Sequence, residues 1–432
     1  MRVAIYTLGC KVNQYETQAM EQELRRRGHE LVDFEDSADA YIVNTCSVTA
    51  VSDKKSRQMI RRAKRRSPNA VVAACGCNIQ THTDEAKGLG IDLIGGTGGR
   101  MAFLDLLEQE ARDRAPRVAV DDSLRRRDFE VLPAGGMAAR TRAMLKVEDG
   151  CVNFCTYCII PYARGPVRSL PLAEAVAQAR QLQAEGYREL VFTGIEISSW
   201  GRDLHDGSSL IDLVEAVAAA APRLRLRLGS LEPRTVTEDF CRRASQLPNL
   251  CPHFHLSLQS GCDATLRRMN RHYDTTQYRA VAEAVRKAFP GAALTTDMMV
   301  GFAGETEVDH QESLQFAREI GFAKIHAFAY SQRPGTRAAA MPDQVSPADK
   351  KRRCAELIAV AAELRKTALT AMLGQTQLVL FESRGQQGCT GYTPNYTPVT
   401  VCDPAAHPGD IRPVLLTAIA PDADSCEGIL TD

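Results

Sequence analysis

The chain has no long apolar run and no excess of charge of either sign. Its 432 residues include 53 Lys plus Arg and 53 Asp plus Glu, and it has a single Trp. No segment is apolar for long enough to span a bilayer, and residues 1–10 lack the length and cleavage pattern of a secretory signal. We therefore expect a cytoplasmic protein without membrane association. Any nucleic-acid binding must come from local basic patches.

Cysteine, by contrast, is abundant, with 14 copies. In a cytosol these thiols stay reduced and are available to ligate metals. Cys151, Cys155 and Cys158 stand in the segment CVNFCTYC. Three thiolates at this spacing can hold three irons of a 4Fe–4S cube and leave one corner open, whereas closed electron-transfer and structural zinc sites supply four ligands. The spacing predicts a reactive site; three core cysteines spaced so by chance are the alternative.

The first part of the chain alternates strand-like and helical runs, which is typical of a doubly wound parallel sheet. The predicted strands are 2–7, 40–45, 70–74 and 91–96, with helices over 14–27 and 50–66. Cys10, Cys46 and Cys77 each follow a strand, and ligands bind at the carboxyl edge of such sheets. We expect these thiols to converge on a second site with an open corner; ordinary loop cysteines are the alternative.

The rest of the chain predicts a linker and two further domains. Within residues 110–140, charged segments (RDRAPR, RRRD) are followed by PAGGMAA, a composition typical of a linker. Six strand-like runs with intervening helices then predict a partial parallel (β/α) barrel, and short strands separated by turns predict a small antiparallel β-barrel at the end. The strand-like runs of the central part are RAMLKVED, 189–193, 224–229, 253–258, 293–300 and 324–330. The fold class is α/β, with predicted domains at 1–125, 137–370 and 372–432.

Further motifs extend the pattern along the whole chain. In order they are TLGCKVNQYET (7–17), VNTCSVT (43–49), ACGCNIQ (74–80), SLEP (230–233), HLSLQSGCD (255–263), RMNR (268–271) and VGFAGET (300–306). Together with CVNFCTYC they resemble the radical S-adenosylmethionine (SAM) methylthiotransferase family. This resemblance implies an auxiliary-cluster domain, a radical-SAM domain and a TRAM-like RNA-binding domain. The opening is similar to the MtaB-type branch, which acts on N6-threonylcarbamoyladenosine beside the tRNA anticodon, and the residues that carry this distinction are Lys11, Val12, Gln14, Tyr15 and Glu16.

The resemblance also implies cofactors and site residues. Two 4Fe–4S clusters are expected, one on Cys10, Cys46 and Cys77 and one on Cys151, Cys155 and Cys158, with all six cysteines catalytic. The second cluster would cleave SAM to a 5′-deoxyadenosyl radical, and the first would carry the sulfur that a second SAM methylates before its delivery to C2 of the adenine. Expected SAM contacts are Tyr157, Gly194, Glu196, Ser230, Glu232, Gln259 and Asp297. Local turn and capping bonds are the alternative for the strand-end residues.

The expected partner is a tRNA anticodon stem-loop. Arg57, Arg61 and Arg65 share one face of the basic helix over 50–66, which favours a polyanion, although a solvated surface helix is the alternative. Arg384 lies in the terminal barrel, a kind of domain that grips RNA. We expect a monomer, with flavodoxin or ferredoxin as electron donor and a separate sulfur donor. Alternative functions are methylthiolation of isopentenyladenosine in tRNA or of a ribosomal protein aspartate, and a noncatalytic RNA-binding iron–sulfur sensor.

Overall fold

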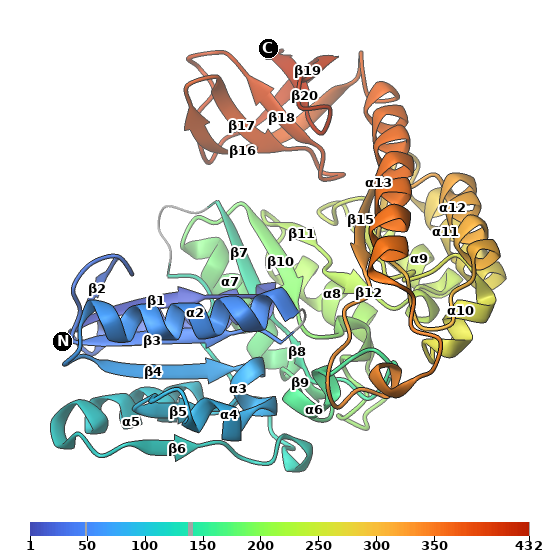
Figure 1. Ribbon diagram of the computed structural model, residues 1–432. Coiled ribbons are helices and arrows are strands. Elements are labelled where there is room, and N and C mark those ends of the chain that lie inside the picture. Colours follow the sequence, from blue (N-terminus) through green and yellow to red (C-terminus); the bar gives the residue numbers. More distant parts are fainter. Residues whose placement is uncertain (48–49, 137–140, 432) are drawn as a thin grey trace.

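The computed structural model describes residues 1–47, 50–136 and 141–431 (Figure 1). Its first part is a six-stranded sheet in the order β2-β1-β3-β4-β5-β6 with every pair parallel. The elements are β1 (Arg2–Thr7), α1 (Lys11–Arg26), β2 (Glu30–Val32), β3 (Ala40–Thr45), α2 (Ala50–Arg66), β4 (Val71–Gly76), α3 (Cys77–Thr81), α4 (Thr83–Lys87), β5 (Leu93–Gly95), α5 (Arg100–Asp113) and β6 (Arg117–Ala119).

Helices cover both faces of this sheet. Met59 and Ile60 of α2 pack on one face, and Leu24 of α1 and Leu104 of α5 pack on the other. Every residue of β3 and β4 is buried as a result, which is why these strands are continuous apolar runs rather than alternating ones. The predicted doubly wound sheet is confirmed.

The linker predicted over 110–140 is wrong in its first part. Helix α5 continues to Asp113, and β6 pairs with β5 as the sixth strand. Strand β6 has three residues and lies at the sheet edge, where it is largely exposed. So short a strand carries no apolar pattern that distinguishes it from a loop. The predicted domain start at 137 and the last residue, 432, lie outside the described residues.

The central part contains two parallel sheets, β11-β10-β7 and β12-β13-β14-β15, with helices on their outer side. This arrangement confirms the predicted partial barrel. Its strands are β7 (Arg142–Lys146), β8 (Glu148–Asp149), β9 (Arg168–Ser169), β10 (Glu189–Thr193), β11 (Arg225–Arg227), β12 (Ser230–Leu231), β13 (His253–Leu256), β14 (Ala293–Val300) and β15 (Lys324–Ala329). Its helices of five or more residues are α6 (Ile160–Arg164), α7 (Leu172–Ala184), α8 (Leu210–Ala220), α9 (Glu238–Ala244), α10 (Asp263–Arg268), α11 (Thr275–Ala288), α12 (Glu307–Ile320) and α13 (Pro347–Thr370).

Local sequence fixes several of these helix ends. Asp274 and Gln277 form a capping box at the start of α11, and Thr306 and Asp309 form one at the start of α12. Each box satisfies backbone N–H groups that the first helical turn leaves unpaired. Helix α12 ends at Gly321, whose φ of +64° is the left-handed conformation that glycine adopts without strain.

The chain ends in a closed five-stranded barrel, as predicted. The strands are β16 (Thr376–Gly385), β17 (Gly388–Tyr392), β18 (Pro398–Val401), β19 (Ile411–Ile419) and β20 (Cys426–Leu430). Four of the five pairings are antiparallel, but β18 and β20 pair in parallel, so the barrel is not wholly antiparallel. Its interior is apolar and includes Val379, Phe381 and Leu416.

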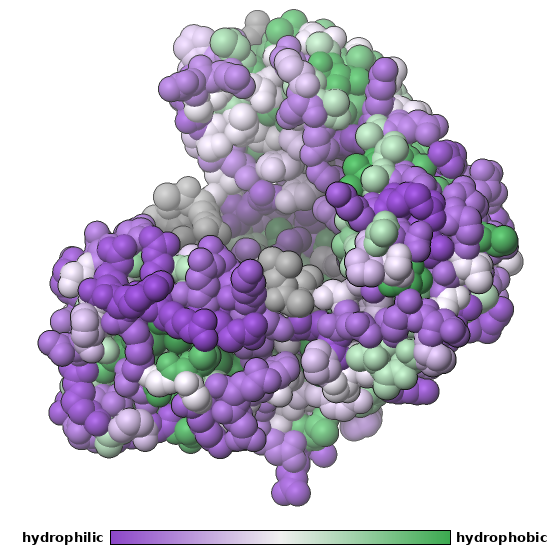
Figure 2. Space-filling view, viewed as in Figure 1, coloured by the Kyte–Doolittle hydropathy of each residue, from purple (hydrophilic) through white to green (hydrophobic). Residues whose placement is uncertain are grey.

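The barrel stands at the end of α13, above the central part, and the N-terminal sheet lies beside the central part (Figure 1). Figure 2 shows the molecule hollowed between these three parts, with mainly hydrophilic side chains around the rim. None of the helices in the described ranges is long and apolar enough to cross a membrane.

Candidate functional site

The first group of thiols lies at the carboxyl edge of the N-terminal sheet. Cys10 is the N-cap of α1, Cys46 follows β3 directly, and Cys77 is the first residue of α3 after β4. Gly9 has φ +104°, and a Cβ there would lie 2.8 Å from Sγ of Cys46, so only glycine lets the Cys10 loop approach Cys46 this closely. Burial raises the pKa of the Cys77 thiol to about 11, and the nearby Cys10 and Cys46 thiols add to the shift. The structure therefore brings the three predicted thiols together.

The second group lies on the loop between β8 and α6. Cys151, Cys155 and Cys158 line one pocket of about 150 Å³. Burial raises the pKa of Cys158 to about 12, with Cys155 as the next cause and Cys77 as a further contributor. Helix α3, which begins at Cys77, contacts α6, which begins at Ile160 just after Cys158, so the two groups of thiols are neighbours.

The donor set of each group fits an iron–sulfur cluster. Buried thiols hold their protons, and a bound metal takes the place of those protons when it binds the thiolates. The nearby Cys75 does not belong to either set, because it lies fully buried within β4 in the apolar core shared with Phe103. Each group therefore offers three thiolate sulfurs, which are soft ligands, and leaves the fourth iron of a cluster without a cysteine ligand.

Five of the seven predicted SAM contacts line the small pocket with the thiols. These are Tyr157, Glu196, Ser230, Glu232 and Gln259. Gly194 does not line this pocket, and a Cβ there would lie 2.9 Å from the Glu148 carboxylate and carbonyl oxygens. Asp297 lines a different, larger cavity.

The Glu196 carboxylate is held by its own turn. It accepts hydrogen bonds from the backbone N–H of Ser198 (3.1 Å) and the hydroxyl of Ser199 (2.6 Å). Burial raises the pKa of Glu196, and these hydrogen bonds only partly offset the effect. Its own N–H donates to Glu148 at 2.6 Å. The residue therefore shapes the turn after β10 as well as the pocket.

Arg271 is a pocket residue to which the sequence assigned no role. Its Nη1 lies 3.3 Å from Sγ of Cys155, and its Nη2 donates to the Glu232 carboxylate at 2.7 Å. The side chain also lies over the ring of Tyr273. Arg271 was visible in the sequence as the last residue of RMNR, but no spacing relates it to Cys155, 116 positions away.

The larger cavity, of about 760 Å³, is bounded by all three parts of the chain. Gly9, Cys10 and Lys11 border it on one side and barrel residues such as Tyr396 on another. Ser230 lines both this cavity and the small pocket. A ligand here would therefore contact Cys10 and lie next to the pocket that Cys151, Cys155 and Cys158 line.

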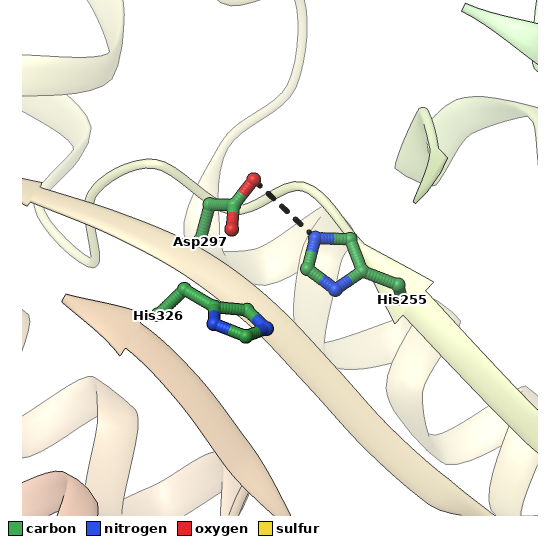
Figure 3. A group of neighbouring side chains, drawn as sticks. All are labelled: His255, Asp297 and His326. Carbon is green, nitrogen blue, oxygen red and sulfur yellow. Dashed lines mark ion pairs between the residues drawn. The ribbon is translucent and has the colours of Figure 1, made fainter. Parts of the chain in front are cut away.

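A cluster of polar side chains forms part of the wall of this cavity (Figure 3). His255 on β13, Asp297 on β14 and His326 on β15 hold their nitrogen and oxygen atoms within 4.8 Å of one another. His255 Nε2 lies 3.4 Å from Asp297, and its Nδ1 is 3.0 Å from the Thr295 hydroxyl. Burial would raise the pKa of Asp297, but the hydrogen bond and charge of His255 outweigh it and leave that pKa below its ordinary value. The cluster therefore presents an ionised carboxylate to the cavity.

The opening motif divides into buried and cavity-lining residues. Val12, Tyr15 and Glu16 are buried. The Glu16 carboxylate pairs with Arg100 (2.7 Å), Lys146 (3.0 Å) and Arg164, which joins α1 to the central part. Five residues distinguish the opening motif, and of these only Lys11 and Gln14 line a second cavity, of about 400 Å³.

The predicted RNA contacts differ in their surroundings. Arg61 and Arg65 are exposed on α2 and Arg57 is half-buried, and within the described ranges none of them has an ion-pair partner. By contrast, Arg62 and Arg66 both pair with Glu35. Arg384 is exposed, but its guanidinium donates to the carbonyls of a barrel loop, those of Asp403, Pro404 and Ala406.

Comparison with known families matches two regions of the chain. Residues 2–95 match the profile described as Uncharacterized protein family UPF0004, and residues 145–317 match the Radical SAM superfamily. The first region holds the Cys10, Cys46 and Cys77 thiols. The second holds the Cys151, Cys155 and Cys158 thiols and the small pocket.

Relatives match over almost the whole length. The chain is 39% identical over 403 residues to threonylcarbamoyladenosine tRNA methylthiotransferase MtaB of Bacillus subtilis, covering 92% of this chain and 89% of that one. It is 33% identical over 436 residues to tRNA-2-methylthio-N(6)-dimethylallyladenosine synthase of Cereibacter sphaeroides, covering 99% and 98%. Among solved structures, the radical S-adenosylmethionine methyltransferase TsrM of Kitasatospora setae aligns with a TM-score of 0.59 at 16% identity, over 78% of this chain and 77% of that one, a likeness of fold.

Proposed function

The chain belongs to the radical-SAM methylthiotransferase family, and on this premise we propose that it adds a methylthio group to C2 of N6-threonylcarbamoyladenosine in tRNA. The observation that carries the proposal is the pair of neighbouring three-thiol groups beside one large cavity. A noncatalytic RNA-binding sensor would need neither a second three-thiol group nor a large cavity next to both groups.

We assign the six cysteines to two 4Fe–4S clusters, one on Cys10, Cys46 and Cys77 and the other on Cys151, Cys155 and Cys158. When bound, the second cluster supplies the electron that cleaves SAM to a radical able to remove hydrogen from an unactivated aromatic carbon, and the first supplies the sulfur. The chain itself holds the reactants: Glu232 and Gln259 offer polar atoms to SAM in the small pocket, and Arg271 neutralises charge at Cys155. Asp297 and His255 bound the cavity where the adenine would lie.

The choice of nucleoside rests on the relatives. The Bacillus subtilis relative is named for threonylcarbamoyladenosine and is 39% identical to this chain over the aligned 403 residues, against 33% over 436 residues for the relative named for dimethylallyladenosine. The opening motif supports the same choice. Isopentenyladenosine is the second candidate.

We also propose that α2 and the terminal barrel bind a tRNA anticodon stem-loop. Arg57, Arg61 and Arg65 of α2 have no ion-pair partner among the described residues, and they lie in the same part of the chain as Cys46. The three proposed domains are 1–125, 137–370 and 372–432. The enzyme would act as a cytoplasmic monomer that receives electrons from flavodoxin or ferredoxin.

The test uses the full chain, reconstituted anaerobically with iron and sulfide and supplied with SAM and dithionite. Three tRNAs are compared: one carrying threonylcarbamoyladenosine, one carrying isopentenyladenosine and one with unmodified adenosine. Mass spectrometry of the nucleosides should show the methylthio gain on threonylcarbamoyladenosine alone. A gain on isopentenyladenosine instead would replace the substrate, and no gain on any of them, with both clusters loaded, would overturn the function.

A further inference from the structure

The cations around the large cavity are paired with acids, with one exception. Arg227 pairs with Glu189 (2.8 Å), and Lys324 and Arg365 both pair with Asp424 (2.7 and 2.8 Å). Arg142, in the adjoining 400 Å³ cavity, pairs with Glu382. Lys11 borders both cavities and makes no hydrogen bond or ion pair to any residue that the structure describes. Among the described residues that line these two cavities, the Lys11 ammonium group is therefore the cation without an acidic partner.

The acids of the cavities are already engaged as well. Asp424 holds two cations, Glu382 holds Arg142, and Asp297 faces His255. Glu189 is shared by Arg142, Arg225 and Arg227. Among the described residues, the acids that line these cavities or act on Lys11 are therefore already paired with other cations. In a concave site walled by protein of low dielectric constant, an unmatched cation attracts a ligand anion more strongly than it would on an open surface.

The substrate of the proposed function carries such an anion. In threonylcarbamoyladenosine the amino acid is joined through its nitrogen, so its carboxylate remains free and negative. Isopentenyladenosine has only hydrocarbon at the same place. Lys11 directly follows Cys10, one of the thiols proposed to deliver sulfur to the adenine. A nucleoside placed at Cys10 would carry its N6 substituent within reach of this residue.

We propose that Lys11 determines substrate specificity by binding the carboxylate of the threonylcarbamoyl group. This inference rests on the proposed function and adds the group that recognises the substrate. It also explains how the opening motif is correlated with the substrate. Val12, Tyr15 and Glu16 are buried and cannot touch a ligand, whereas Lys11 stands open to the cavity.

The test compares two synthetic anticodon stem-loops, one with threonylcarbamoyladenosine as the free acid and one with its methyl ester, which removes the charge and keeps the shape. Wild-type protein should show a KM about 10- to 100-fold lower for the acid, the size expected of one charged hydrogen bond. Lys11→Met should raise the KM for the acid to that of the ester and leave the ester unchanged. Lys11→Arg should restore most of the preference for the acid. Lys87→Met, which removes an exposed lysine of α4 paired with Asp84, is the matched control and should match wild type.

Binding by fluorescence anisotropy, together with iron content, separates recognition from damage at Cys10. Lys11→Met should lose the difference in Kd between acid and ester whether or not its iron content falls. An equal loss on both stem-loops, or a wild type that does not distinguish them, would overturn the role of Lys11 and leave the proposed function standing. A wild type that binds the stem-loops but methylthiolates neither would overturn the proposed function and this inference with it.

Discussion

At the scale of single residues, the opening motif (TLGCKVNQYET, 7–17) contains residues with two different roles. Glu16 lies buried among Arg100, Lys146 and Arg164 and ties α1 to the central part, and the Tyr15 hydroxyl donates to the carbonyl of Leu132 at 2.6 Å. These residues hold the Cys10 loop in place without facing the cavity. A motif correlated with a substrate therefore contains residues that shape the scaffold as well as residues open to a ligand.

Glu16→Gln should lower stability without altering the choice of substrate. The change leaves three buried cations short of a partner, and breaking a buried ion pair in this way costs about 3–5 kcal/mol. The free energy of unfolding in urea measures the loss, and the ratio of KM values for acid and ester stem-loops should stay at the wild-type value. A changed ratio at unchanged stability would assign Glu16 to recognition instead.

Arg271→Met should impair the radical reaction. The variant removes the donor 3.3 Å from the Cys155 thiol and leaves the buried Glu232 with Arg234 as its remaining ion-pair partner among the described residues. Since hydrogen bonds and positive charge near cluster sulfurs raise a reduction potential, the midpoint potential should become more negative, and 5′-deoxyadenosine formation should fall about tenfold or more. A redox titration followed by electron paramagnetic resonance measures the first effect. An unchanged potential would limit Arg271 to packing.

At the scale of secondary-structure elements, β11 contacts the barrel through arginines that a carboxylate of β10 holds. Glu189, its first residue, is fully buried and binds Arg225 and Arg227 on β11. Arg225 donates to the Leu378 and Tyr392 carbonyls of the barrel, and Arg227 donates to that of Pro394. One carboxylate therefore organises the guanidinium groups on which the barrel rests.

Glu189→Gln should loosen the barrel in a pH-dependent way. Burial would raise the pKa of Glu189, but its arginine partners outweigh it and lower the pKa from 4.5 to about 2. A lowered pKa gives stability that is present above the unfolded-state value and is lost as the pH falls from about 4.5 toward 2. The variant should thus be about 3 kcal/mol less stable at pH 7, and the difference should shrink below pH 4.5.

Urea unfolding of both proteins between pH 3 and pH 7 measures this difference, and limited proteolysis near residue 372 reports on the barrel directly. If the difference in unfolding free energy between wild type and variant stays constant down to pH 3, the charge of Glu189 is not what holds the arginines.

The elements that could be predicted from the sequence are the long ones. The strands over 40–45 and 293–300 and the helix over 50–66 have the predicted bounds, because each is a run with an unmistakable period or a continuous apolar stretch. Strands β2, β6, β9 and β12 escaped prediction, since each has only two or three residues and a run that short shows no clear period. The six cysteines were found because spacing and strand ends placed them. Arg271 and the isolation of Lys11 were not, because both depend on how distant segments pack.

At the scale of the whole molecule, residues from three parts of the chain line both the 760 Å³ and the 400 Å³ cavity. Helix α2 presents Arg57, Arg61 and Arg65 without ion-pair partners within the described ranges, whereas Glu35 engages Arg62 and Arg66. The balanced charge of the chain thus conceals a local basic face. Association with tRNA should depend on this face and on salt.

Replacing Arg57, Arg61 and Arg65 together by Gln should weaken tRNA binding and flatten its salt dependence. Each lost phosphate contact lowers the slope of log K against log salt by about 0.7–0.9, so the slope should fall by about 2–3. Arg62→Gln with Arg66→Gln is the matched control and should change the slope much less, because those cations are already neutralised. Equal effects in both variants would place the RNA elsewhere.

The central claim is that two separate groups of thiols perform successive parts of one reaction. The most direct measurement quantifies 5′-deoxyadenosine and the methylthio nucleoside in parallel for Cys10→Ala and Cys151→Ala, each reconstituted and given SAM, dithionite and tRNA carrying threonylcarbamoyladenosine. Cys10→Ala should still form 5′-deoxyadenosine but no methylthio nucleoside, and Cys151→Ala should form neither. A Cys10→Ala protein that makes the methylthio nucleoside at the wild-type rate would contradict the claim.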